Sequence, residues 1–243
     1  MTREFLSRLA GLFGGPSAPM HEAMHRNAEA CAALDQSAPL AEQDFVVLDT
    51  ELSDLDRRTG EILSIGAVRI REFTLRPGER FSTLARPERA MATGSTLIHR
   101  LTPERLMAAP PLAEVLPGFV DWCGGAVLVG HYIDLDMGFV NRETRRLMGR
   151  DMANPCVDTL RMAQAYEERR DGAYLGAHLD TLSYSLTALS ARHGLPDFPR
   201  HDALADAMQT AYLFLFLARK IRGGSIATLK DLWEVQRARV GWG

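Results

Sequence analysis

The chain has 243 residues, of which 46% are hydrophobic and 24% charged, and its formal net charge is −3 at pH 7. This length and composition are typical of one globular domain with a substantial core plus a short appendage. The weak negative charge excludes a generally basic surface that attracts polyanions, so a nucleic-acid partner would have to be held locally by metal ions and selected basic residues.

Residues 1–40 are predicted to form a helical N-terminal extension. Apolar residues recur at helical spacing between Phe5 and Phe13, Gly14-Gly15-Pro16 interrupts them, and an Ala-rich second helix is expected over residues 20–34. The segment is too short for its own core. We therefore expect it to pack on the main domain, with docking on a protein partner as the alternative.

A metal-binding pattern lies within this extension. The sequence His21-Glu22-Ala23-Met24-His25 matches H-E-x-x-H, which on a helix places two imidazoles one turn apart to bind zinc. A zinc protease also needs a third ligand and surrounding walls, and no substantial fold precedes the pattern. The polar face of a short helix is the preferred interpretation.

The main domain is predicted over residues 41–222 and begins with a buried strand that ends in Asp49-Thr50-Glu51. Side chains two apart on a strand share a face, so Asp49 and Glu51 point the same way. Two like charges in this position are tolerable mainly when a cation lies between them. A second, antiparallel strand is expected over 61–70 and a third over 81–85, after a turn at Pro77-Gly78.

Helices then alternate with short strands. We expect helices from Thr102-Pro103 and over about 111–122, strands at 126–129 and near 155–157, and a C-terminal helical segment, 223–243, that packs on the domain or trails it. Three consecutive strands followed by this alternation predict the α/β class, with a mixed five-stranded sheet flanked by helices.

Two later helix starts carry acidic residues. Asp136 is expected in the first turn of the helix that follows the fourth strand, where α/β sheets place ligands and the helix dipole favours a carboxylate. Asp202 is a suitable N-cap for a helix running to about residue 221, with Asp206 one turn inside and His201 on the loop before it. A histidine beside an anchored carboxylate suits a general base.

The compartment follows from the cysteines and the apolar segments. Three widely spaced cysteines without a CxxC pair argue against a disulfide framework or a zinc knuckle. The first 15 residues lack the apolar core of a signal peptide, and the longest apolar run, 211–218, is far shorter than the roughly 20 residues that cross a bilayer. We expect a soluble cytoplasmic protein with no membrane contact.

Taken together, three segments resemble the motifs of the DEDDh 3′-to-5′ exonucleases, the RNase H-like group that includes the epsilon subunit of bacterial DNA polymerase III. They are Asp49-Thr50-Glu51, the stretch from His131 through Asp136 to Phe139, and residues 201–207. Their order and separations also fit, over about residues 43–220. The resemblance implies an RNase H-like fold and release of nucleoside monophosphates from free 3′ ends, with single-stranded DNA favoured and RNA left open.

The resemblance also implies roles for individual residues. The ligands of two divalent cations, Mg²⁺ or Mn²⁺, would be Asp49, Glu51, Asp136 and Asp206. His201 would be the general base, Thr50 and Leu52 would border the terminal nucleotide, His99 would contact it, and Asp158 would have a secondary role.

The chain departs from the family at three places, none of which removes a ligand. Leu52-Ser53-Asp54 stands where Thr-Thr-Gly is usual, Ser64 replaces a common glutamate, and Tyr132 replaces the usual asparagine. These departures bear on which substrate fits.

Two other functions compete with this hypothesis. In an HD-type phosphohydrolase His201-Asp202 would bind metal, but such enzymes are all-helical, and the first half of this chain is rich in strands. The other alternative is a catalytically silent nucleic-acid or replisome binding module with an exonuclease fold, recruited through residues 1–40. The intact set of mutually repelling acids argues against it.

Overall fold

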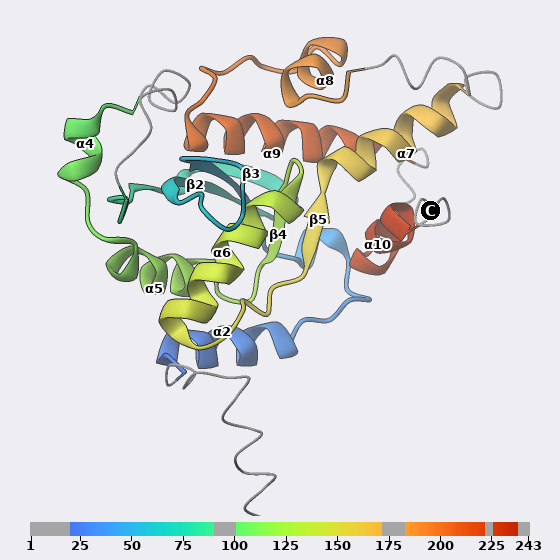
Figure 1. The fold of residues 1–243 in the computed structure, drawn as a ribbon. Helices are drawn as coiled ribbons and strands as arrows, with labels where there is room; N and C mark the ends of the chain where they lie inside the picture. Colours follow the sequence, from blue (N-terminus) through green and yellow to red (C-terminus); the bar gives the residue numbers. More distant parts are fainter. Residues whose placement is uncertain (1–19, 90–100, 172–182, 222–225, 238–243) are drawn as a thin grey trace, which may run out of the picture.

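The structure, a computed structural model, describes residues 20–89, 101–171, 183–221 and 226–237 (Figure 1). One mixed sheet has the strand order β3-β2-β1-β4-β5. β1, β2 and β3 form an antiparallel meander, and β4 and β5 run parallel to β1. The strands are β1 Phe45–Leu52, β2 Ile62–Arg71, β3 Thr74–Leu84, β4 Val127–Gly130 and β5 Cys156–Asp158. The predicted five-stranded mixed sheet is confirmed.

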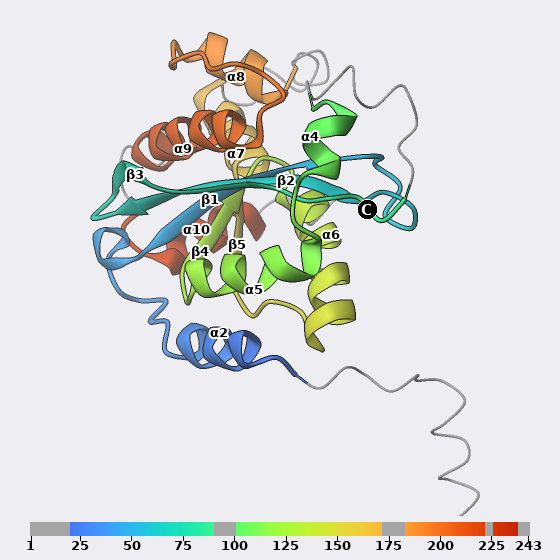
Figure 2. The ribbon, with the colours of Figure 1, turned by 90° about the vertical axis from the view of Figure 1, so that its left-hand side faces the viewer.

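Helices cover both faces of the sheet, which Figure 2 shows edge-on. Val46 and Leu48 of β1 pack in one core with α2, α5 and α6. Phe45 and Val47, on the other face, pack in a second core with α7, α9 and α10. No described helix is long and apolar enough to cross a membrane. The helices are α2 Glu22–Ala32, the 3₁₀ turn Leu40–Glu42, α4 Pro103–Met107, α5 Leu112–Cys123, α6 Ile133–Met148, α7 Thr159–Asp171, α8 Leu186–Arg192, α9 Ala203–Lys220 and α10 Leu229–Arg237.

The predicted turn at Pro77-Gly78 was wrong. The chain reverses at Glu72 and Phe73, whose φ angles of 50° and 52° are those of a two-residue hairpin turn. Pro77 and Gly78 lie inside β3, where the register shifts so that Val68 faces Arg80 while Arg69 faces Arg76. A bulge of this kind on an edge strand accommodates a proline without losing a central ladder hydrogen bond.

The described part of the N-terminal extension packs on the domain through α2. The Asn27 side chain donates to the Gly124 carbonyl at 2.8 Å and accepts from the Ala153 N–H at 2.9 Å, while Met24 is fully buried. His21 caps this helix, because its Nδ1 accepts the Ala23 N–H at 3.1 Å. The H-E-x-x-H pattern therefore begins with a helix cap. Docking of the extension on a protein partner stays a prediction.

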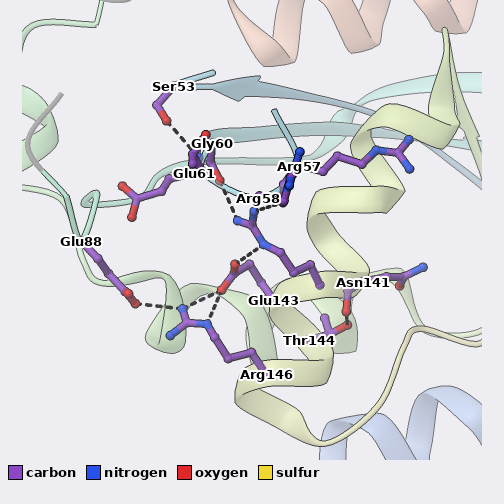
Figure 3. A network of polar contacts seen from close by, with 12 residues as sticks. Ser53, Arg57, Arg58, Gly60, Glu61, Glu88, Asn141, Glu143, Thr144 and Arg146 are labelled. Carbon is purple, nitrogen blue, oxygen red and sulfur yellow. Dashed lines mark hydrogen bonds and ion pairs between the residues drawn. The ribbon is translucent and has the colours of Figure 1, made fainter. Parts of the chain in front are cut away.

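A network of arginines fastens the loop after β1 to α6 (Figure 3). Arg142 donates to the carbonyls of Arg57 and Gly60 and, at 2.7 Å, to the carboxylate of Glu143. Arg146 bonds the other Glu143 oxygen at 2.7 Å and reaches Glu88 at 2.8 Å. The Glu143 side chain is only 7% exposed. The network thus joins the loop after β1 to α6, and β1 and α6 carry three of the four predicted acids, Asp49, Glu51 and Asp136.

Candidate active site

The period of β1 decides where its polar residues point. Phe45 and Val47 face α9, so Asp49 and Glu51, which follow at the same period, lie on that face too. Thr50 lies on the opposite face, toward α6, and is 8% exposed. One strand therefore supplies carboxylates to α9 and a hydroxyl to α6.

A glycine lets α9 approach these carboxylates closely. Gly66 of β2 is the cross-strand partner of Asp49. A Cβ atom at Gly66 would lie 2.1 Å from the backbone nitrogen of Leu204 and 2.2 Å from the carbonyl carbon of Ala203. Only a residue without a side chain allows the first turn of α9 to lie directly on the sheet at this point.

The start of α9 is fixed by Asp202, whose carboxylate accepts the Ala205 N–H at 3.0 Å. Asp206 lies one turn inside the helix. Asp49, Glu51 and Asp206 each offer a carboxylate oxygen, and these oxygens all lie within 4.8 Å of one another. Oxygen ligands lie about 2.0 to 2.6 Å from Mg²⁺ or Ca²⁺, so one cation can reach all three.

Asp136 is tied to this cluster through Thr50. It is 5% exposed, in the first turn of α6, and lies outside the group of three. One oxygen of its carboxylate accepts both the Thr50 N–H, at 3.0 Å, and the Thr50 hydroxyl, at 2.6 Å. Because Thr50 stands between Asp49 and Glu51 in β1, this pair of bonds holds the Asp136 carboxylate against the strand that carries both acids.

The acids raise one another's pKa values. Burial, and then the charges of Asp136, Asp206 and Glu51, hold the pKa of Asp49 well above its usual range. Burial, Asp206 and Asp202 raise the pKa of Glu51 to about 8, and burial raises that of Asp136 to about 7. Burial also raises the pKa of Asp206. A divalent cation would stabilise the charged forms, and an all-oxygen donor set suits Mg²⁺ or Mn²⁺.

His201 lies beside the cluster in an unusual backbone conformation. Its φ is 59°, in the left-handed region, and its backbone N–H donates to the Asp206 carboxylate at 3.1 Å. The residue is exposed on the loop before α9. A non-glycine residue held in this region is often found at functional sites.

The remaining predicted residues are placed differently. The hydroxyl of Thr50 is engaged by Asp136, and Leu52 is 5% exposed within the core formed with α5 and α6. His99 lies outside the described residues. Asp158 is 6% exposed and accepts the N–H groups of Tyr132 and Leu160 at 3.1 and 2.9 Å.

Sequence reasoning missed the contacts of His131 and the backbone conformation of Tyr132 at the start of α6. The ring nitrogens of His131 contact the Thr159 hydroxyl at 3.0 Å and the Tyr184 carbonyl at 2.8 Å, and burial lowers its pKa to about 4. Tyr132 has a φ of 61° and is 50% exposed at the start of α6. The sequence signal for this conformation was Tyr132 at a position where the resemblance leads one to expect asparagine, a residue that tolerates it.

Comparison with known proteins identifies the family of this chain. Residues 46–214 match the model of the exonuclease (RNase T) family. The DNA polymerase III subunit epsilon-like protein of Rhodobacter capsulatus is 35% identical over 193 residues, which are 78% of this chain and 26% of that protein. The DNA polymerase III subunit epsilon of Aquifex aeolicus is 29% identical over 75% of this chain and 84% of its own. The chain thus spans about a quarter of the first relative and most of the second.

Solved structures show the same fold. Exonuclease X in complex with 5′ overhanging duplex DNA has a TM-score of 0.56 at 23% identity, covering 79% of this chain and 99% of that one. Escherichia coli exonuclease I in complex with a dA16 oligonucleotide has a TM-score of 0.63 at 20% identity, covering 74% and 41%. The RNase H-like exonuclease fold is therefore confirmed. Sequence match, fold and acidic cluster agree, and the chain belongs to the exonuclease family, a family of phosphodiester hydrolases.

Proposed function

We propose that this protein is a metal-dependent 3′-to-5′ exonuclease that releases nucleoside monophosphates from the 3′ ends of nucleic acid, with single-stranded DNA as its favoured substrate. The observation that carries this proposal is the cluster of Asp49, Glu51 and Asp206, with oxygens within 4.8 Å of one another. Asp136 is joined to it through Thr50. Relatives named for the epsilon subunit, and a fold neighbour that binds an oligonucleotide, support the substrate class.

The four acids and His201 have different roles in this proposed reaction. Asp49, Glu51, Asp206 and Asp136 would hold two divalent cations, Mg²⁺ or Mn²⁺. When bound, such ions lower the pKa of water and neutralise charge on the attacked phosphate and the leaving oxygen. His201, in its neutral form, accepts the proton of the attacking water. The bond from its backbone N–H to the Asp206 carboxylate keeps His201 next to the cluster, while Thr50 fixes the carboxylate of Asp136.

Digestion of matched DNA and RNA oligonucleotides, labelled at the 5′ end, tests the proposal. With Mn²⁺ we expect a ladder of products shortened one nucleotide at a time from the 3′ end, faster on single-stranded DNA, and none in EDTA. Asp49→Asn should reduce the rate by at least about 100-fold, because the charge that holds the cations is lost.

Asp56→Asn is the matched control, since Asp56 is an exposed acid in the loop that follows β1. It should digest DNA at the wild-type rate. Intact oligonucleotides after incubation of wild-type protein with Mn²⁺ would contradict the proposal. Binding of the oligonucleotide without cleavage would instead support the silent binding module.

A further inference from the structure

A groove of about 340 Å³ opens beside the acidic cluster. It lies between α4 and the loop that leads into α9, and both lie at the same end of the sheet in Figures 1 and 2. Glu51 and His201 line this groove, so it is continuous with the candidate active site. The hydroxyl residues Ser64, Ser82 and Thr83 of β2 and β3 also line it.

Two arginines line the groove from different elements. Arg105 belongs to α4, Arg200 directly precedes His201, and both residues are exposed. Neither guanidinium group forms an ion pair or hydrogen bond within the part of the chain that the structure describes. In contrast, the guanidinium groups of Arg142 and Arg146 are bonded to the chain itself. Arg105 and Arg200 are therefore available to a ligand.

The ligand that fits this arrangement carries phosphate. A strand that reaches the acidic cluster brings its negative phosphates next to buried carboxylates, which repel them. Free guanidinium groups beside the cluster offset that repulsion, and their planar fork bonds phosphate oxygens in pairs. The 3′-terminal nucleotide has no phosphate beyond the one being cleaved. A second phosphate in the groove must then belong to the preceding nucleotide.

We infer that this groove is a subsite for the phosphate that lies one nucleotide to the 5′ side of the cleaved bond, with Arg105 and Arg200 as positioning residues. This inference rests on the proposed exonuclease function. Holding the strand at a second phosphate fixes the cleaved bond over the acids, which is the kind of orientation that accelerates a bimolecular step.

Two minimal substrates isolate the subsite. The dinucleotide d(TpT) carries only the phosphate that is cleaved, whereas d(pTpT) adds the preceding phosphate. We expect wild-type protein to prefer d(pTpT) in kcat/KM. Arg105→Ala and Arg200→Ala should each lower kcat/KM for d(pTpT) by about 10- to 100-fold, the range of one charge-assisted hydrogen bond, with kcat lowered as well as KM raised because the cleaved bond is less well oriented. Both variants should leave d(TpT) hydrolysis unchanged.

Arg58→Ala is the control, because its side chain is 92% exposed on the loop after β1, away from the groove. It should match wild type on both substrates. On longer oligonucleotides each groove variant should also reduce the slope of log kcat/KM against log salt by about 0.7, the value for one phosphate contact on a single strand. Unchanged thermal midpoints would show that the variants fold.

Equal losses on d(TpT) and d(pTpT) would overturn the inference, because the arginines would then act on the cleaved phosphate or on the fold. No loss on either substrate would overturn it as well. If wild-type protein cleaves nothing, the proposed function fails, but oligo(dT) binding in Ca²⁺, followed by fluorescence anisotropy, still decides on the groove. Weaker binding by both groove variants, and not by Arg58→Ala, would support the subsite, whereas unchanged binding would overturn it.

Discussion

At the scale of single residues, Tyr132 carries a backbone cost. Its φ of 61° and ψ of 40° place it in the left-handed region, and the bond from its N–H to Asp158 holds it there. This conformation costs an L-residue about 1–2 kcal/mol, and the cost is smaller for asparagine than for most other residues. We expect Tyr132→Asn to raise the free energy of unfolding by about 0.5–1 kcal/mol relative to Tyr132→Ala, as measured by urea denaturation. An asparagine variant no more stable than the alanine variant would contradict this account.

Individual side chains also show what the sequence can and cannot predict about the site. The two-residue period of a strand was enough to place Asp49 and Glu51 on one face, and they lie there with Asp206. The engagement of the Thr50 hydroxyl by Asp136 was not predictable, because it depends on how α6 meets β1. The left-handed backbone of His201 was not predictable either, because it depends on the bond from its N–H to the Asp206 carboxylate.

At the scale of secondary-structure elements, the contact of α9 with β2 decides whether the acids meet. A methyl group at Gly66 would lie 2.1 Å from the Leu204 nitrogen, so the backbone of α9 would have to move outward. We expect Gly66→Ala to destabilise the protein by about 1–3 kcal/mol, the usual cost of overpacking. Exonuclease activity should fall by more than the loss of folded protein accounts for, since Asp206 would move away from Asp49.

The matched control for this substitution is Gly78→Ala. A Cβ atom at Gly78 would meet nothing within 4 Å, so this variant should keep both stability and activity. Urea denaturation and oligonucleotide digestion of the two variants make the comparison. A Gly66→Ala protein indistinguishable from Gly78→Ala would show that the close approach of α9 is not needed.

The sequence pattern predicted the order of the strands, but it did not predict where the turn between β2 and β3 lies. Pro77-Gly78 is a strong local turn signal, whereas Glu72-Phe73 contains neither glycine nor asparagine. The structure nevertheless turns at Glu72-Phe73 and absorbs the proline in a bulge of the edge strand β3. Pairing of β3 along the length of β2 overrides the local preference, and such long-range pairing is not visible in a short window of sequence.

At the scale of the whole molecule, the acidic cluster links stability to pH and to cations. The folded-state pKa values of about 8 for Glu51 and about 7 for Asp136 lie well above the roughly 4 expected for unfolded carboxylates. Between those limits the folded state binds more protons than the unfolded state. The stability contributed by this cluster is therefore fully present below about pH 4 and is lost as the pH rises through 7 to 8.

Cations should reverse this trend, because they bind the deprotonated carboxylates of the folded protein and not the unfolded chain. We expect Mn²⁺ to leave the thermal midpoint nearly unchanged at pH 5.5. At pH 8.5, a concentration 100 times the dissociation constant should raise the midpoint by about 5–10 °C, since such binding adds about 2.7 kcal/mol. Thermal scans in Mn²⁺ and in EDTA at both pH values measure the difference. Glu51→Gln should shrink it, and a Mn²⁺ effect of equal size at the two pH values would show that these acids do not hold the cations.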